Sequence, residues 1–422
     1  MIINQKKIIY FLSYLLLLIP LALITGPFLP DLFLVVIVIS FIMIIFAQKK
    51  IEILDNIYFK IYLIICLILS LNSFLSNNLS SLQSSIFYFR FGIFALACYF
   101  LINNNQNILK NLLYMFIIIY FALFIDSIYQ YFFLKNILGF VYINEQNFRV
   151  TSFFGKDEIL GSYTARFFPV LLFLLTYFHN LIFFTKKNLL KIILFITSFV
   201  VVLLSGERTS LALYMIFIIF ILFSSYNYRK LLLVPLMACF IIFTITTLNS
   251  EKIYKRMVVS TINQLGLDSK SERMYIFSKT YEGHYKIALN MFLEKPFFGH
   301  GAKMFRFYCV KEENFVDFNA CTTHPHNFYA QTLAETGIVG FFILLSLFAF
   351  IFYLFLKNLY FQIINKSQLI SDESICLLGF YFITLFPFLP SGNFFNNWLS
   401  VVNYYPLGFL IYLIKKNKFY VR

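Results

Sequence analysis

Uninterrupted apolar stretches of about 18 residues or more recur along this chain, and they restrict its fold more than any other feature. Each is long enough to cross the ~30 Å hydrocarbon core of a bilayer, where the backbone must satisfy its own hydrogen bonds. A β-barrel would instead need alternating strands of ~10 residues. The chain is 60% hydrophobic and 13% charged, which leaves too little polar surface to coat a soluble protein. We therefore expect an all-α, polytopic membrane protein.

The apolar stretches predict about twelve transmembrane helices. The first follows Lys6 and Lys7 without a small-residue cleavage site, so we expect it to be retained. The predicted helices cover roughly residues 8–25, 31–47, 57–72, 84–103, 111–134, 159–178, 189–205, 209–225, 231–248, 337–356, 374–390 and 398–414.

The distribution of basic residues predicts the orientation of these helices. Most Lys and Arg residues of the short connections fall on the side of the N-terminus, whereas the short loops opposite hold only Arg149, Lys156 and Arg208. Because short cytoplasmic loops are enriched in Lys and Arg, we expect both termini to be cytoplasmic. The net charge of +15 then reflects membrane topology and does not indicate a nucleic-acid partner.

Residues 249–336 form one long polar segment on the outer side, which holds most of the histidines. We expect three parts: a membrane domain over 1–248 with about nine helices, a loop domain over 249–336, and a membrane domain over 337–422 with about three. Within the loop, residues 269–296 have the pattern of an amphipathic helix, with Ser269 and Glu272 as a capping box and Pro296 at its end. Its predicted apolar face consists of Phe277, Tyr281, Tyr285, Ala288 and Phe292.

The six cysteines divide by location. Cys309 and Cys321 are the only pair in the outer loop, where an oxidising compartment would allow a disulfide. A bridge over this short separation stabilises by roughly 3 kcal/mol and would tether the segment after Cys321. The other four, Cys66, Cys98, Cys239 and Cys376, fall in apolar stretches and are predicted to be packing residues.

His324 and His326 flank Pro325 just before a predicted helix, in the stretch CTTHPHNFYAQTLAETGIVG. Pro325 disfavours helical conformation at His324, so both imidazoles should lie on a rigid entry turn. A neutral imidazole is a natural proton acceptor for a hydroxyl nucleophile, but a capping or buried structural histidine fits equally well. Glu335 follows His326 by nine residues, on the opposite face of a straight helix, and is not expected to orient it.

Several arginines are predicted to gather near the outer membrane surface. Arg208 lies in SGERTS between two apolar stretches, and Arg90 and Arg166 lie within stretches, where arginine is costly and usually marks a function. With Arg149 and Arg273 in outer loops, they suit a lipid-linked diphosphate, which guanidinium groups bind in a bidentate fork. Alternatively, Arg166 snorkels to the interface and Arg208 merely pairs with Glu207.

Acidic pairs give weak support for a metal site. Asp157–Glu158 and Glu312–Glu313 could offer oxygen ligands to Mg²⁺, but Asp157 is more simply explained as a helix N-cap. We expect neither a metal nor a cofactor.

Five segments resemble the O-antigen ligase and polymerase family of bacterial envelope glycan assembly. HPHNFYAQTLAETGIVG resembles its His-Asn…Glu-x-Gly signature, EKPFFGHGAKMFR its Pro-x-x-Gly-x-Gly segment, and SGERTSLALY its Ser-x-x-Arg-Thr turn. RVTSFFGKDEILGSYTARFFP and PSGNFFNNWLS are similar to further stretches of the family. The resemblance covers roughly residues 120–410.

The resemblance implies a glycosyltransferase C-like membrane fold in the bacterial inner membrane, with a periplasmic loop and active site. The donor would be a glycan on undecaprenyl diphosphate, and the acceptor a lipid A–core oligosaccharide. The family's histidine corresponds to His326, with His324 as an additional candidate; its outer arginine corresponds to Arg208, and a loop arginine to Arg273. The family resemblance implies neither metal nor nucleotide sugar.

We therefore expect His326 and Arg208 to be catalytic, with Arg208, Arg273, Arg149 and Arg166 on the diphosphate, and Arg90 and Glu207 as secondary candidates. An inverting transfer follows from attack opposite the leaving diphosphate. An O-antigen polymerase using the same donor is the alternative within this class. A transporter or flippase of lipid-linked sugars is the alternative from another class, although its polar residues would gather near the bilayer midplane.

Overall fold

A computed structural model gives the structure of the chain and describes residues 2–141, 149–178, 187–267, 273–313, 316 and 318–421. Within these ranges every regular element is a helix, apart from isolated bridges between Lys135 and Val141 and between Ile370 and Tyr420. The predicted all-α class is therefore confirmed. The predicted capping box of Ser269 and Glu272 lies outside the described residues.

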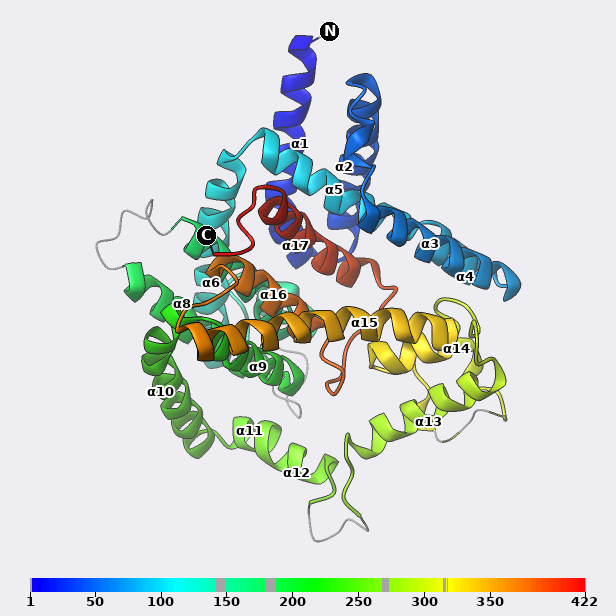
Figure 1. Cartoon of the computed structure of the whole chain (residues 1–422). Helices are drawn as coiled ribbons and strands as arrows, with labels where there is room; N and C mark the ends of the chain where they lie inside the picture. The colour runs from blue at the N-terminus through cyan, green and yellow to red at the C-terminus, as the bar shows by residue number, and fades with distance from the viewer. Residues whose placement is uncertain are drawn as a thin grey trace.

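The first ten helices precede the long polar segment (Figure 1). They are α1 (Ile2–Ala22), α2 (Phe28–Ala47), α3 (Ile57–Leu75), α4 (Leu79–Ile86), α5 (Phe89–Asn104), α6 (Asn107–Phe133), α7 (Leu160–Tyr177), α8 (Lys187–Leu204), α9 (Arg208–Ser224) and α10 (Tyr226–Asn249). The polar segment contains shorter helices, and three longer ones follow or begin at its end. They are α11 (Glu251–Tyr254), the π-helix η4 (Lys255–Val259), α12 (Ser260–Gln264), α13 (Lys279–Glu294), α14 (Phe305–Tyr308), the 3-10 turn η5 (Phe318–Ala320), α15 (Phe328–Asn365), α16 (Asp372–Thr384) and α17 (Asn397–Lys415).

Seven segments of the described chain are helices long and apolar enough to cross a membrane. They are Lys6–Thr25, Phe28–Ala47, Leu79–Asn104, Asn107–Phe133, Leu160–Tyr177, Tyr226–Asn249 and Phe328–Asn365. Three shorter apolar helices are Phe59–Leu75, Asn188–Leu204 and Arg208–Ser224. Every apolar stretch noted in the sequence overlaps a helix, although 374–390 is helical only as far as Thr384. Membrane-helix character is therefore confirmed, while the number of about twelve crossings stays a prediction.

Helix α7 lies at the centre of the bundle, between α6, α8, α9 and α16. Its Phe168 packs with ring centroids 4.6 Å from Phe195 and 5.1 Å from Tyr214. Helix α5 approaches α17 closely, because a Cβ at Gly408 would lie 2.3 Å from the Cβ of Cys98. All four free cysteines are buried, as expected of packing residues.

Helix α15 is broken at Gly337, whose φ of 65° and ψ of −163° are non-helical. A short first part, Phe328–Thr336, therefore precedes the apolar part that begins at Ile338. Glycine is needed here because only glycine adopts this backbone conformation readily. Figure 1 shows α15 crossing the molecule, with α14 beside its N-terminal end.

Residues 296–301 pack directly against this break, backbone on backbone. The N–H of Ile338 donates to the carbonyl of Pro296 at 2.8 Å, and the N–H of Gly301 donates to the carbonyl of Glu335 at 2.8 Å. A Cβ at Gly299 would lie 2.5–2.6 Å from backbone atoms of residues 335–337. Two segments that the sequence presents as separate motifs thus form one contact.

The polar segment has a small hydrophobic core of its own. Helix α13 contributes its buried face of His284, Ile287, Ala288 and Met291. The core contains Ile287, Ala288, Met291, Phe305, Cys309, Ala320 and Ala334. Of the apolar face predicted for this helix only Ala288 is fully buried, and the other four residues are partly buried. The prediction omits His284, a polar residue that is buried and lies within hydrogen-bond distance of a backbone carbonyl. The predicted start is also wrong: the helix begins at Lys279, with the Ser278 hydroxyl as its cap.

Candidate active site

The two candidate histidines occupy a turn directly before α15. Asn327 is the N-cap of this helix, because its Oδ1 accepts backbone N–H groups two and three residues ahead, at 2.9 and 3.1 Å. Its Nδ2 donates to the carbonyl of Pro387 at 2.8 Å, and the N–H of Ser391 donates to the carbonyl of His326 at 2.8 Å. The turn is thereby fixed to the connection between α16 and α17.

His326 itself has a left-handed backbone conformation, with φ of 54°. This region costs an L-residue roughly 1–2 kcal/mol, so the neighbouring hydrogen bonds must hold the residue in place. Strained residues of this kind concentrate at functional sites. The catalytic role of His326 stays a prediction.

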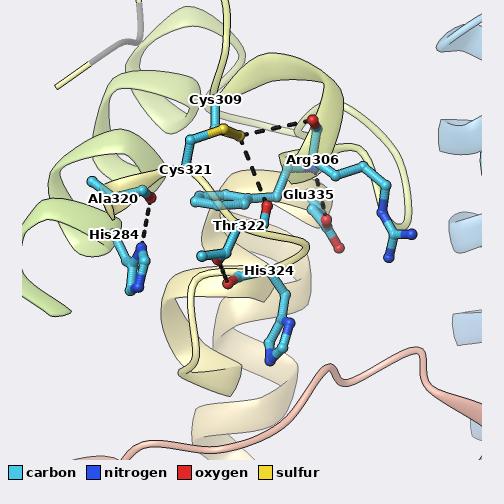
Figure 2. The surroundings of a disulfide bond; sticks show 9 residues. His284, Arg306, Cys309, Ala320, Cys321, Thr322, His324 and Glu335 are labelled. Carbon is cyan, nitrogen blue, oxygen red and sulfur yellow. Dashed lines mark hydrogen bonds between the residues drawn. A yellow bond between two sulfur atoms is a disulfide. The ribbon is translucent and has the colours of Figure 1, made fainter. Parts of the chain in front are cut away.

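Three imidazoles and a phenol gather at this turn. The His326 ring centroid lies 4.1 Å from that of His324, 5.3 Å from His284 and 5.9 Å from Tyr281. His284 Nδ1 lies 2.6 Å from the carbonyl oxygen of Ala320, so Nδ1 is the donor and its tautomer is fixed (Figure 2). Helix α13 and the turn before α15 therefore build the site together.

The environment keeps both candidate bases neutral. Burial, followed by the effect of the neighbouring His284, lowers the pKa of His326 to about 4. Burial, followed by the effects of His326 and Arg306, lowers the pKa of His324 to about 3. Desolvation disfavours the charged imidazolium, so near pH 7 each ring is in the form that can accept a proton.

Arg208 is the first residue of α9 and reaches toward α12. Its guanidinium donates to Thr261 Oγ1 at 3.3 Å and to Gln264 Oε1 at 2.7 Å. Both partners are neutral, so they leave the guanidinium charge uncompensated. Among the described residues no ion pair joins Arg208 to Glu207, so the alternative that Arg208 merely pairs with Glu207 is not supported.

Tyr281 lies beside the histidines and within the electrostatic influence of this arginine. Burial raises the pKa of Tyr281, while Arg208, Arg149 and Arg256 each lower it. Arg256 Nε also donates to the carbonyl of Gly206, 3.0 Å away, which attaches η4 to the turn before α9. Three guanidinium groups thus lie within electrostatic reach of one phenol beside His326.

The other predicted arginines have partners of their own, and among them only Arg149 also acts on Tyr281. Arg149 forms an ion pair with Glu158. Arg166 is buried in the bundle and donates to Ser162 Oγ and Thr384 Oγ1, both at 3.3 Å.

Arg273 and Arg90 already have carboxylate partners. The exposed Arg273 pairs with Glu282 at 2.7 Å and lies over the Tyr275 ring. Arg90 pairs with Asp31 at 2.9 Å. Neither is brought into contact with Arg208 among the described residues.

Glu207 caps a helix. Its carboxylate accepts the N–H groups of Gly161 and Ser162 at 2.7 and 3.0 Å, and the Ser210 hydroxyl at 2.8 Å. Burial raises the pKa of Glu207 to about 7, against the opposing effect of these donors. The N-cap role expected of Asp157 is wrong, because α7 begins after Ile159 and Glu207 takes that role from another helix.

Glu335 is fully buried, and its carboxylate holds two segments of the chain together by hydrogen bonds. Its two carboxylate oxygens accept the N–H of Lys303 at 3.0 Å and that of Phe305 at 2.9 Å, together with the amide of Gln331 at 2.9 Å. These bonds join the first part of α15 to α14. As expected from its spacing, Glu335 does not contact His326.

Cys309 and Cys321 form a disulfide with a Cα–Cα distance of 5.2 Å (Figure 2). The bond attaches the segment that carries the histidines to the residues after α14. It also lies against the small core, to which Cys309 belongs.

Three site residues are not singled out by the sequence: Tyr281 and His284 as partners of His326, and Arg256. Tyr281 and His284 are three residues apart and so share one side of α13. Arg256 follows an apolar stretch closely, in EKIYKRM, where a basic residue looks like an ordinary membrane-flanking charge. Only the folded chain brings these side chains together.

Comparison with known proteins agrees with this geometry. Residues 193–345 match the family model described as O-antigen ligase. The matched segment contains Arg208, Arg256, Tyr281, His326 and Glu335. No curated protein matches the chain. The resemblance to the O-antigen ligase family is thereby confirmed over residues 193–345.

Proposed function

We propose that the protein is a membrane glycosyltransferase of the O-antigen ligase type. It transfers a glycan from undecaprenyl diphosphate to a hydroxyl of a lipid A–core or similar acceptor. One observation carries this proposal: neutral His326 lies beside Tyr281, around which Arg208, Arg149 and Arg256 gather. A proton acceptor next to concentrated positive charge suits the transfer of a glycan away from a diphosphate.

The arginines bind the donor diphosphate and stabilise the charge that develops on it as it leaves. Arg208 is best suited, because its present partners are neutral oxygens that a phosphate can replace. Arg149 and Arg256 add positive charge at the same phenol. Arg273 and Arg166 have a supporting role, since neither acts on Tyr281 as the other three arginines do, and both engage other side chains.

His326 accepts the proton of the acceptor hydroxyl. The acceptor oxygen then bonds to the anomeric carbon, the bond from that carbon to the diphosphate oxygen breaks, and the polyprenyl diphosphate leaves with the electron pair. Attack opposite the leaving group inverts the anomeric centre. Bound diphosphate raises the pKa of His326 above its value in the free protein, which makes the imidazole a stronger base once donor is present.

The location follows from the charge pattern and the chemistry. We place the protein in the bacterial inner membrane, with cytoplasmic termini and a periplasmic site. The segment 249–336 then covers the donor and limits the access of water, which would otherwise compete as the acceptor.

Complementation of a strain that lacks the gene tests this function. Lipopolysaccharide is compared on gels after expression of wild type, His326→Ala, Arg208→Ala and the charge-conserving Arg208→Lys, with equal membrane levels verified by immunoblot. We expect His326→Ala to lose about 10²–10⁴-fold of the activity. Arg208→Lys should retain part of it, because lysine keeps the charge but loses the fork.

The gel pattern separates the candidate reactions. Bare lipid A–core with accumulating lipid-linked polymer means a ligase, and core with a single repeat unit means a polymerase. An unchanged ladder in the deletion strain excludes both for that glycan. Full activity of His326→Ala removes the proposed base.

A further inference from the structure

A second group of cations, Lys303 and Arg306, lies near the histidine pair, because Arg306 acts electrostatically on His324. Neither forms an ion pair within the described part of the chain. Nε of Arg306 is buried without a hydrogen-bond partner. Buried donors are normally satisfied, so an orphan guanidinium nitrogen indicates an absent ligand.

The nearby carboxylates do not neutralise these cations. The carboxylate of Glu335 accepts hydrogen bonds from two backbone N–H groups and from the side-chain amide of Gln331. Asp31 is paired with Arg90 at 2.9 Å and also accepts a hydrogen bond from Asn397. The local balance is therefore positive.

Both the backbone conformation and the electrostatic environment of Lys303 are unfavourable. Its φ of 61° is left-handed, and its N–H is bound to Glu335. Burial lowers the pKa of Lys303, as do Arg306 and Arg90, while Glu335 and Asp31 partly oppose them. Neighbouring cations disfavour each other's charged form, and a bound anion offsets this effect.

His324 adds a third unpartnered group. The residue is 9% exposed, and its Nε2 is buried without a hydrogen bond. Its Nδ1 lies 2.9 Å from the Thr323 hydroxyl. When that hydroxyl donates to Nδ1, the ring proton is on Nε2, which becomes a donor beside the backbone of Ser391. In Figure 2 the His324 ring and the Arg306 guanidinium both point away from the disulfide, with the Glu335 carboxylate between them in this view.

We propose that Lys303, Arg306 and Nε2 of His324 form a subsite for an oxyanion, a phosphate or carboxylate group carried by the sugar acceptor. The proposal rests on the proposed function: it puts the donor diphosphate on the Arg208 side of His326 and the acceptor on the Arg306 side. An anion held here orients the acceptor so that a neighbouring hydroxyl meets His326. Lysine supplies a point charge, and arginine a planar fork.

The first test measures binding without catalysis. Inorganic phosphate is titrated into full-length protein in nanodiscs, and the midpoint of thermal unfolding is recorded. We expect phosphate to raise the midpoint of the wild type, and Lys303→Gln/Arg306→Gln to lose most of that rise. Lys311→Gln is the matched control, because it removes an exposed cation of the same segment that lies over Tyr308. An undiminished rise in the double variant overturns the subsite.

The second test assigns the anion to the acceptor. Transfer is measured with an intact acceptor, with one stripped of phosphate, and with one whose carboxylates are reduced. We expect Lys303→Gln/Arg306→Gln to raise the acceptor KM roughly ten- to a hundredfold and to leave the donor KM unchanged. With wild type, the acceptor that lacks the recognised anion should show the same rise in KM. With the variant, removing that anion from the acceptor should raise KM no further.

The outcomes are distinct. A raised donor KM, or an equal loss on every acceptor, overturns the acceptor subsite. Absence of transfer by the wild type refutes the proposed function instead, and phosphate binding then still decides whether the anion subsite exists.

Discussion

Replacing Gly337 by alanine should release residues 296–305 from α15. The break at this residue has φ of 65° and ψ of −163°, a region that costs other residues about 1–3 kcal/mol. The new Cβ would lie 2.3 Å from the carbonyl oxygen of Phe297 and 2.7 Å from the N of Phe298. These are backbone atoms, so the segment itself must move.

The movement adds to the strain. It lengthens the hydrogen bond from the N–H of Ile338 to the carbonyl of Pro296. Such a hydrogen bond contributes about 1 kcal/mol to stability. Together the two effects destabilise the contact by about 3 kcal/mol. Gly155→Ala is the matched control, because Gly155 has a similar φ of 63° but a Cβ added there would meet no atom within 4 Å.

Hydrogen exchange followed by mass spectrometry measures this contact locally. A loss of about 3 kcal/mol corresponds to roughly hundredfold faster exchange of the amides of Gly301 and Ile338. Gly155→Ala should leave these amides protected. Equal protection in Gly337→Ala and wild type would refute the argument that residues 296–301 need glycine at this break.

Two further predictions concern the disulfide and the base. Cys309→Ser/Cys321→Ser should destabilise the protein by about 3 kcal/mol, and a reductant should lower the thermal midpoint of wild type but not of this variant. If the reductant lowers the midpoint of the variant equally, the disulfide is not the bond that stabilises the protein. Cys66→Ser is the control. Because the pKa of His326 is lowered to about 4, kcat/KM should stay level from about pH 8 to about 5 and fall below it. Protonation of this lowered group favours the unfolded chain, so stability present above about pH 6.5 is lost as the pH falls toward about 4. An acidic limb near about pH 6.5 in kcat/KM would show that another group is the base.

The membrane helices are predictable from sequence because length and apolarity alone decide them. Each predicted stretch overlaps a helix, although the number of crossings is a further step. The turn at His326 is also predictable in outline, since Pro325 and Asn327 are ordinary signals of a helix start. Its left-handed backbone is not, because tertiary bonds such as that from Ser391 impose it.

Side-chain partners across elements are the least predictable part. Glu207 and Asp157 are both acidic residues near predicted helix ends, and nothing local shows that Glu207 caps α7 from another helix. His284 lies in a polar stretch, and its burial depends on the distant carbonyl of Ala320. In both cases the deciding partner lies far along the sequence.

The attachment of the histidine turn to residues 387–391 also sets the order in which the site can mature. The chain is synthesised from its N-terminus, so His326 emerges well before its partners Pro387 and Ser391. Until α16 and the start of α17 have been made, nothing fixes the carbonyl of His326 or the amide of Asn327. A nascent chain that stops short of this connection therefore carries every candidate catalytic side chain but lacks the hydrogen bonds from Ser391 to His326 and from Asn327 to Pro387.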